Sequence, residues 1–358
     1  MSADVQWTDL KAIIIDAAGP ELTPEEVALF KREKPAGFIL FRRNCVSKKQ
    51  VTDLVAAMRE AVGCSDIPVL IDQEGGTVAR LRQPEWVEYP AAKVFGDLAM
   101  HSLEKAEVAV QLNSRLMGAD LIEMGITVNC APVVDVPSPD CHEFLAGSRT
   151  YGRDVKTISH LGAAVCRGLL EAGITPVIKH IPGHGRAKVD SHHGLPLVES
   201  SLSELSETDF KPFKYLAQSD MKTALWAMAA HVVYSKADHD SAASVSRTIT
   251  DKIVRGEIGF DGVLLADDVS MKALGGTVES RVKATMAAGM DLTMLCNATF
   301  ADRAAALSVT PKVSPEAARR LIAAEKARKA GAKQVKGNKN QLRQELAEML
   351  GNSWKQAV

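Results

Sequence analysis

The densest group of reactive side chains lies between Lys179 and Pro196, in the stretch KHIPGHGRAKVDSHHGLP. This stretch holds four of the nine histidines, together with an aspartate and basic residues. Its glycines and prolines exclude a continuous helix and predict a loop. Because a loop with so many titratable groups is more often functional than structural, we expect it to line a binding or catalytic site.

Within this loop, Asp190 stands two residues before His192. In a turn, the carboxylate can accept a hydrogen bond from one ring nitrogen and fix the tautomer. Its negative charge favours the imidazolium and raises a pKa that starts near 6.5. Such a histidine can donate a proton in one step and accept one in the next. We therefore expect an acid/base pair, with His193 as the alternative partner of Asp190.

The same loop also raises the question of a metal site. His180, His184, His192 and Asp190 are residue types that bind zinc or iron. However, the spacing contains no HExxH or comparable helical pair, and a loop does not fix ligand geometry. We therefore predict no metal and no other cofactor, and expect that some of these residues, such as His184, only fold the loop.

A second candidate group is the acid pair in LLADDVSM, Leu264–Met271. Paired acids at the end of a buried strand are costly unless they are used or hydrogen-bonded. Asp267 directly follows an apolar run and is placed to point into a cavity, where a carboxylate could attack an anomeric carbon. We expect Asp268 to cap the following turn or to hold a neighbouring loop.

The elements that must position these residues are eight short apolar runs that alternate with amphipathic stretches. Continuous apolar runs suit strands that are buried on both faces of a parallel sheet. A helix is predicted to begin at Thr23, and others to span Ser47–Ala61 and Leu103–Met124. Eightfold strand–helix alternation predicts a (β/α)8 barrel, with a doubly wound open sheet as the alternative. The runs are Ala12–Ile15, Gly37–Phe41, Pro68–Ile71, Thr127–Ala131, Thr175–Ile178, Thr223–Met228, Gly262–Ala266 and Asp291–Cys296.

Polar residues follow most of these runs. Any one of them could simply cap the next helix. In a barrel, however, the carboxyl ends of the strands share one face, so residues at equivalent positions converge on one pocket. The residues are Asp72, Asp135, Lys179, His180, His231, Asp267 and Asn297.

The remainder of the chain differs in composition. We predict a catalytic barrel over residues 1–310 and a tail over 311–358, rich in Ala, Lys, Arg and Glu. The tail is interpreted as a solvated helix, a mobile linker and a last short helix, Gln341–Leu350, in preference to a binding tail.

Bulk properties exclude several classes of protein. A net charge of −1 over 358 residues gives no electrostatic footprint for nucleic acid or an anionic membrane. The N-terminus does not resemble a signal peptide, and no run approaches the roughly 20 apolar residues of a membrane span. The six cysteines are scattered without CxxC spacing, which favours a reducing cytoplasm.

At the loop and the acid pair, the sequence resembles family 3 glycoside hydrolases, in particular the bacterial cytoplasmic β-N-acetylglucosaminidases of peptidoglycan recycling. The resemblance implies a (β/α)8 barrel and a retaining mechanism, with Asp267 as nucleophile, His192 as acid/base and Asp190 as its partner. It also implies a small sugar substrate, a muropeptide with terminal β-linked N-acetylglucosamine. The residues that it implies bind the sugar are Asp72, Arg80, Arg149, Lys179 and His180. The stretches that carry the resemblance are GFILFRRN, IDQEGGTVARL, NCAPVVDV, SRTYG, KHIPGHG with DSHHGLP, AAHVVY, GFDGVLLADDVSM and AAGMDLTMLCN.

Three other functions remain open on the residues alone. A histidine acid/base tolerates an approaching phosphate, as a glycoside phosphorylase would need. A metallohydrolase would use the histidines as ligands. A catalytically silent sugar-binding barrel would need no nucleophile.

Overall fold

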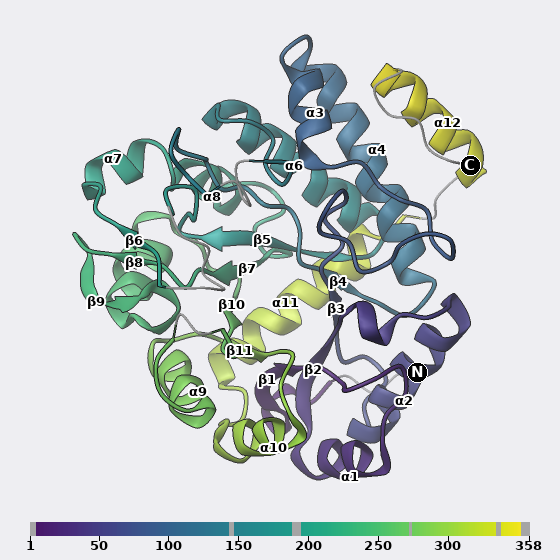
Figure 1. Ribbon diagram of the computed structural model, residues 1–358, viewed down its shortest axis with the longest axis vertical. Coiled ribbons are helices and arrows are strands. Elements are labelled where there is room, and N and C mark those ends of the chain that lie inside the picture. Colours follow the sequence, from purple (N-terminus) through teal and green to yellow (C-terminus); the bar gives the residue numbers. More distant parts are fainter. Residues whose placement is uncertain (1–4, 143–146, 188–194, 272–273, 334–337, 352–358) are drawn as a thin grey trace.

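Eight parallel strands form a closed barrel, in the order β1-β11-β10-β7-β5-β4-β3-β2. The computed structural model describes residues 5–142, 147–187, 195–271, 274–333 and 338–351 (Figure 1). Each predicted apolar run overlaps one barrel strand. The ring closes because β1 pairs with both β2 and β11, which confirms the (β/α)8 barrel and excludes the open sheet. The barrel strands are β1 (Lys11–Ile15), β2 (Pro35–Leu40), β3 (Val69–Ile71), β4 (Val128–Asn129), β5 (Thr175–Ile181), β7 (Trp226–Ala229), β10 (Val263–Asp268) and β11 (Leu292–Leu295).

Helices surround the barrel, and their starts follow local sequence signals. Thr23 and Glu26 form a capping box at the start of α1, where Pro24 occupies the first helical position. Ser47 caps α2 by accepting a hydrogen bond from the backbone N–H of Gln50. A π-helix, η4 (Ile249–Glu257), follows β7 in the chain. The outer α-helices are α1 (Pro24–Glu33), α2 (Lys48–Val62), α3 (Ala92–Ala99), α4 (Leu103–Ile122), α6 (Val155–Glu171), α7 (Leu202–Glu207), α8 (Lys211–Ala217), α9 (Val278–Ala287) and α10 (Phe300–Val309).

A small second sheet lies beyond the carboxyl ends of β5 and β7. It consists of β6 (Leu197–Val198), β8 (Val233–Tyr234) and β9 (Asp238–Ala242), with β8 in the middle. The pairing of β6 with β8 ties the chain after residue 194 to the chain after β7. This sheet was not predicted from the sequence.

The helix α11 (Pro315–Gly331) crosses the barrel at the amino ends of the strands (Figure 1). The chain just before α11 is hydrogen-bonded to the chain just before β1, since Val313 donates a backbone hydrogen bond to Leu10 at 2.9 Å. The sequence predicted a solvated helix, but one face of α11 is buried. The buried residues are Ala317, Ala318, Leu321 and Ala324. Its buried positions are mostly alanines, which give little amphipathic contrast in the sequence.

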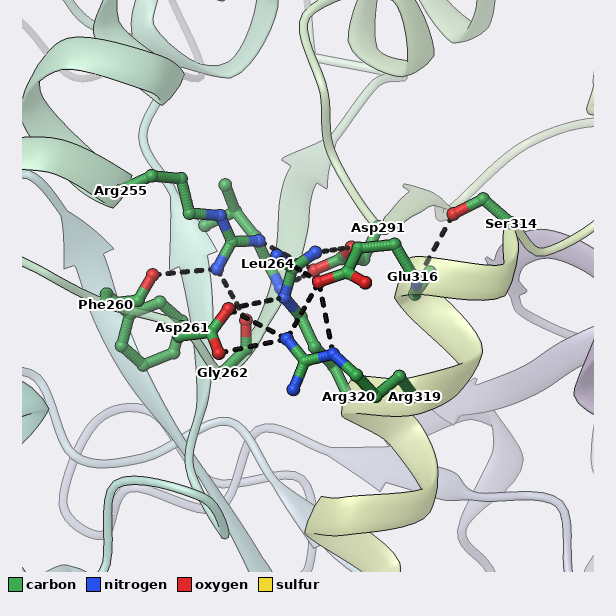
Figure 2. A network of polar contacts seen from close by, with 11 residues as sticks. Arg255, Phe260, Asp261, Gly262, Leu264, Asp291, Ser314, Glu316, Arg319 and Arg320 are labelled. Atoms are coloured by element: carbon green, nitrogen blue, oxygen red, sulfur yellow. Dashed lines mark hydrogen bonds and ion pairs between the residues drawn. The ribbon is translucent and has the colours of Figure 1, made fainter.

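Ion pairs fix α11 to the barrel (Figure 2). The carboxylate of Asp291, just before β11, accepts from Arg320 of α11 and from Arg255 of η4, each at 2.8 Å. It also accepts from the backbone N–H of Leu264 in β10 at 2.8 Å. One buried acid therefore joins α11, η4, β10 and β11.

The last described helix, α12 (Lys339–Leu350), packs on α4. Its basic side chains pair with an acid of α4: the ammonium of Lys339 lies 2.9 Å from Asp120, and the guanidinium of Arg343 lies 2.8 Å from the same carboxylate. Among the described helices, none is both long and apolar enough to cross a membrane.

Candidate active site

The six predicted site residues that the structure describes all lie at the carboxyl end of the barrel. Asp72 follows β3, and Arg80 lies in the loop beyond it. Arg149 lies in the loop after β4, and β5 carries Lys179 and His180 near its end. The sixth, Asp267, is at the end of β10, where the chain leaves the barrel.

Five of the side chains at this face form one continuous chain of ion pairs. The ammonium of Lys179 lies 2.9 Å from Asp72 and 2.7 Å from Glu74. Asp72 also accepts from Arg80 at 3.0 Å. Arg149 binds Glu74 with two hydrogen bonds, of 2.9 and 2.7 Å. We call this row of three cations and two carboxylates the charged wall; its members are Arg80, Asp72, Lys179, Glu74 and Arg149.

In the charged wall, neighbouring charges affect the pKa values more strongly than burial does. Burial by itself would raise the pKa of both carboxyl groups, but Lys179 and Arg80 hold the pKa of Asp72 well below its usual range. Arg149 and Lys179 likewise lower the pKa of Glu74 to about 2. Burial would lower the pKa of Lys179, yet Asp72 and Glu74 raise it. All of these groups are therefore charged at neutral pH.

A buried acid orients His180. Asp135, completely buried, lies 2.7 Å from the Nδ1 of His180. Its other oxygen accepts from the backbone N–H groups of His180 and His184, at 3.1 and 2.7 Å. Burial and the nearby His180 lower the pKa of His184 to about 4, so His184 is neutral. This arrangement agrees with the expectation that His184 folds the loop.

The half-buried Asp267 is held as an anion. Burial would raise its pKa, but His231, His180, the backbone N–H of Asp268 and Lys179 together lower it. The Asp268 N–H donates to the Oδ1 of Asp267 at 2.7 Å. An ionised carboxylate at the end of β10, near the cationic Lys179, is a competent nucleophile.

The neighbouring Asp268 serves the backbone instead. Its carboxylate accepts from the N–H and hydroxyl of Ser270, at 2.8 and 2.6 Å, and from the N–H of Cys296 at 2.9 Å. Burial raises the pKa of Asp268 to about 6 against these hydrogen bonds. Asp268 thus holds the turn after β10 and the end of β11, as expected from the sequence.

Behind this turn lies His231, which is fully buried. Its Nε2 lies 2.9 Å from the backbone oxygen of Asp268, and its Nδ1 lies 2.6 Å from the hydroxyl of Ser244. Burial lowers the pKa of His231, although the nearby Asp267 opposes this shift. A carbonyl can only accept, so the neutral ring carries its proton on Nε2 and accepts the Ser244 hydroxyl on Nδ1.

The predicted acid/base pair, Asp190 and His192, lies outside the described residues, as does His193. The chain that leads into this segment is fixed at the same face. Gly185 packs so closely on the loop after β4 that an added Cβ would lie 1.9 Å from the backbone oxygen of Val136. Glycine is therefore required at this position.

Further contacts hold both ends of this segment. Ala187 accepts a backbone hydrogen bond from His142 at 2.9 Å. Arg186 lies 2.7 Å from the buried carboxylate of Asp209. After the segment, Leu197 pairs with Val233 in the small sheet.

Two acids at this face, Glu74 and Asp16, were not predicted from the sequence. Glu74 lies within the quoted stretch IDQEGGTVARL, two residues after Asp72, and that spacing could have identified it. Asp16 directly follows the first apolar run, is fully buried, and pairs with Arg43 and, at 2.7 Å, with Arg303. The pattern of polar residues after strands should have included it.

Within the parts of the chain that the structure describes, His, Cys, Asp and Glu side chains form no group of three or more that could hold a metal ion. Two members of the ligand set considered from the sequence, Asp190 and His192, fall outside those parts.

Comparison with known proteins gives consistent matches along most of the chain. Residues 4–324 match the sequence family described as "Glycosyl hydrolase family 3 N terminal domain". A Beta-hexosaminidase of Pseudomonas aeruginosa (strain LESB58) is 36% identical over 298 residues, which cover 82% of this chain and 84% of that protein. A Beta-hexosaminidase of Haemophilus influenzae is 34% identical over 291 residues, 80% of each chain.

Solved structures agree with this match. NagZ from Neisseria gonorrhoeae, crystallised with N-trifluoroacetyl-D-glucosamine, superposes with a TM-score of 0.83 at 28% identity, over 96% of this chain and 98% of that one. A glycoside hydrolase family 3 beta-N-acetylglucosaminidase from Paenibacillus sp. gives a TM-score of 0.82 at 26% identity, over 97% and 69% of the two chains.

Proposed function

Because the chain belongs to glycosyl hydrolase family 3, we propose that it removes terminal β-linked N-acetylglucosamine with retention, through a covalent intermediate on Asp267. The chain is a glycoside hydrolase of the β-N-acetylhexosaminidase type. The observation that carries the proposed intermediate is the ionised Asp267 at the end of β10, whose pKa neighbouring groups lower against burial.

In the first step, the carboxylate of Asp267 attacks C1 of the sugar while His192, protonated and paired with Asp190, gives its proton to the leaving oxygen. The bond between C1 and that oxygen breaks as the ester to Asp267 forms. In the second step, neutral His192 takes a proton from water, the water oxygen attacks C1, and Asp267 is released as a carboxylate.

We assign the binding of this sugar to the charged wall and to His180. The wall offers the guanidinium groups of Arg80 and Arg149, the ammonium of Lys179 and the carboxylate of Asp72, which are the polar partners that hydroxyl and amide groups need. The substrates that we propose are muropeptide fragments, and the site of action is the cytoplasm. Both follow from the resemblance in sequence.

Hydrolysis of chromogenic β-glycosides tests the activity, with N-acetylglucosaminide compared with glucoside and xyloside. The Asp267→Ala variant should lose turnover by a factor on the order of 10³ or more, yet still bind N-acetylglucosamine in calorimetry. The control is Asp240→Ala, at an acid whose side chain is 92% exposed. Near-normal turnover in Asp267→Ala would refute the nucleophile, and sugar 1-phosphate formed on adding phosphate would indicate a phosphorylase.

A further inference from the structure

One carboxylate oxygen of Glu74 binds two cationic groups. The Nζ of Lys179 and the Nη2 of Arg149 both lie 2.7 Å from its Oε1. The Nε of Arg149 occupies the other oxygen at 2.9 Å. The Nζ of Lys179 and the Nη2 of Arg149 share the Oε1 oxygen, so they are no farther apart than the sum of their two 2.7 Å distances to it. All three side chains are at most 8% exposed.

Two like charges at this separation repel each other strongly where little water can screen them. The repulsion is tolerated because the carboxylate lies between them. Other groups also act on Lys179: the carboxylates of Asp72 and Asp267, and the thiol of Cys130. Arg149 opposes the positive charge of Lys179, whereas Asp72 and Glu74 favour it.

A tight turn places Glu74. Its backbone N–H donates to the oxygen of Val78 at 2.9 Å, and the N–H of Gly75 donates to the same oxygen at 3.2 Å. Gly75 has a φ of +97°, and an added Cβ would lie 2.3 Å from the oxygen of Pro90. The backbone of the turn is therefore fixed, and the carboxylate of Glu74 is fixed with it.

We propose that Glu74 is a positioning residue, which holds the Lys179 ammonium and the Arg149 guanidinium side by side so that both can donate to the same sugar. It acts through these two groups and does not touch the substrate. The inference rests on the proposed function, which assigns sugar binding to both groups.

The contacts explain why a glutamate is needed. Three N–H donors converge on its two oxygens, and each oxygen of a carboxylate can only accept. Glutamine has one oxygen and an NH₂ group, so whichever way the amide turns, its NH₂ faces a donor. Aspartate keeps the charge but is one methylene shorter, and cannot reach both cations from the same backbone position.

Three proteins test the proposal: wild type, Glu74→Gln and Glu74→Asp. For Glu74→Gln we expect the Kd of N-acetylglucosamine and the KM of a chromogenic substrate to rise about 10- to 100-fold, with a much smaller fall in kcat. This split between KM and kcat separates a role in binding from a general loss of structure, which would lower kcat as well.

For Glu74→Asp we expect binding to stay weak, since the charge is kept but the shorter side chain does not reach both cations. The control is Glu60→Gln, an exposed glutamate of α2, which should match wild type. A Glu74→Gln variant that loses kcat at constant KM overturns the proposal. If that variant fails to fold, Glu74→Asp decides alone, and wild-type affinity in it overturns the proposal.

These outcomes are distinct from a failure of the proposed function. In that case wild type itself would release no N-acetylglucosamine. A wild-type enzyme that hydrolyses the substrate, with Glu74 variants that bind the sugar equally well, would refute the positioning role alone.

Discussion

The ring of His231 donates from Nε2 to the backbone oxygen of Asp268 at 2.9 Å and thereby holds the peptide next to Asp267. The hydroxyl of Ser244, 2.6 Å from Nδ1, fixes this tautomer from the other side. The end of β10 is therefore held by groups that are buried in the protein. This arrangement links the aim of the Asp267 carboxylate to two buried side chains.

The Ser244→Ala variant should lower kcat up to about tenfold, with little change in KM. Removing the hydroxyl leaves the buried Nδ1 without a donor, which costs about 1–3 kcal/mol of folding free energy and frees the ring to change tautomer. Steady-state kinetics and urea denaturation measure the two effects. Ser308→Ala serves as the control, because this serine is exposed and its hydroxyl donates to the backbone oxygen of Ala305. Unchanged kcat in Ser244→Ala would show that His231 and Ser244 do not aim Asp267.

The Gly185→Ala variant should lower kcat/KM strongly without unfolding the barrel. Its Cβ would lie 1.9 Å from the oxygen of Val136, so the backbone that leads toward residues 188–194 must move. Gly19→Ala is the control, because its Cβ would meet nothing closer than 4.0 Å. Activity and circular dichroism are measured for both variants. If the two variants were equally active, the position of this backbone would have no effect on catalysis.

The Arg320→Ala variant should lower the free energy of unfolding by about 1–3 kcal/mol, since it removes a charged hydrogen bond to the buried Asp291. The adjacent Arg319 has a side chain that is 51% exposed, and Arg319→Ala should cost less than about 0.5 kcal/mol. Urea denaturation compares the two. An equal loss in both variants would contradict the central role of Asp291 in attaching α11 (Figure 2).

Stability should depend on acid through Glu74. Its pKa of about 2 in the folded state lies below the ordinary value of 4.5, so the folded protein binds fewer protons than the unfolded chain between these values. The contribution of ionised Glu74 to the free energy of unfolding is complete above about pH 4.5 and is lost as the pH falls toward 2. The difference in unfolding free energy between wild type and Glu74→Gln should therefore shrink on acidification. Urea denaturation at a series of pH values measures it, and a constant difference would contradict the assignment.

The barrel could be predicted because its strands are buried on both faces. Ala12–Ile15 and Gly262–Ala266 are unbroken apolar runs, and each forms a strand at the expected place. Closure could not be read from the sequence, since it depends on the pairing of β1 with β11, which are far apart along the chain.

The site was predicted where one residue follows one strand, as for Asp72 and Asp267. Roles that depend on contacts between distant loops were missed. Nothing local shows that Glu74 meets Arg149, 75 positions away, or that Ser244 selects the tautomer of His231. The buried face of α11 was missed for a different reason, because alanines can pack closely without a strong apolar signal.

The placement of α11 has a consequence for synthesis. The strand pairs β1–β2 and β2–β3 can form early, but the amino end of the barrel is covered only by a helix encoded after all eight strands. While the ribosome still holds this helix, Asp291 lacks Arg320 as a partner. The amino end of the barrel is therefore covered only after α11 has been synthesised, and a product truncated before α11 would expose apolar surface to chaperones and proteases.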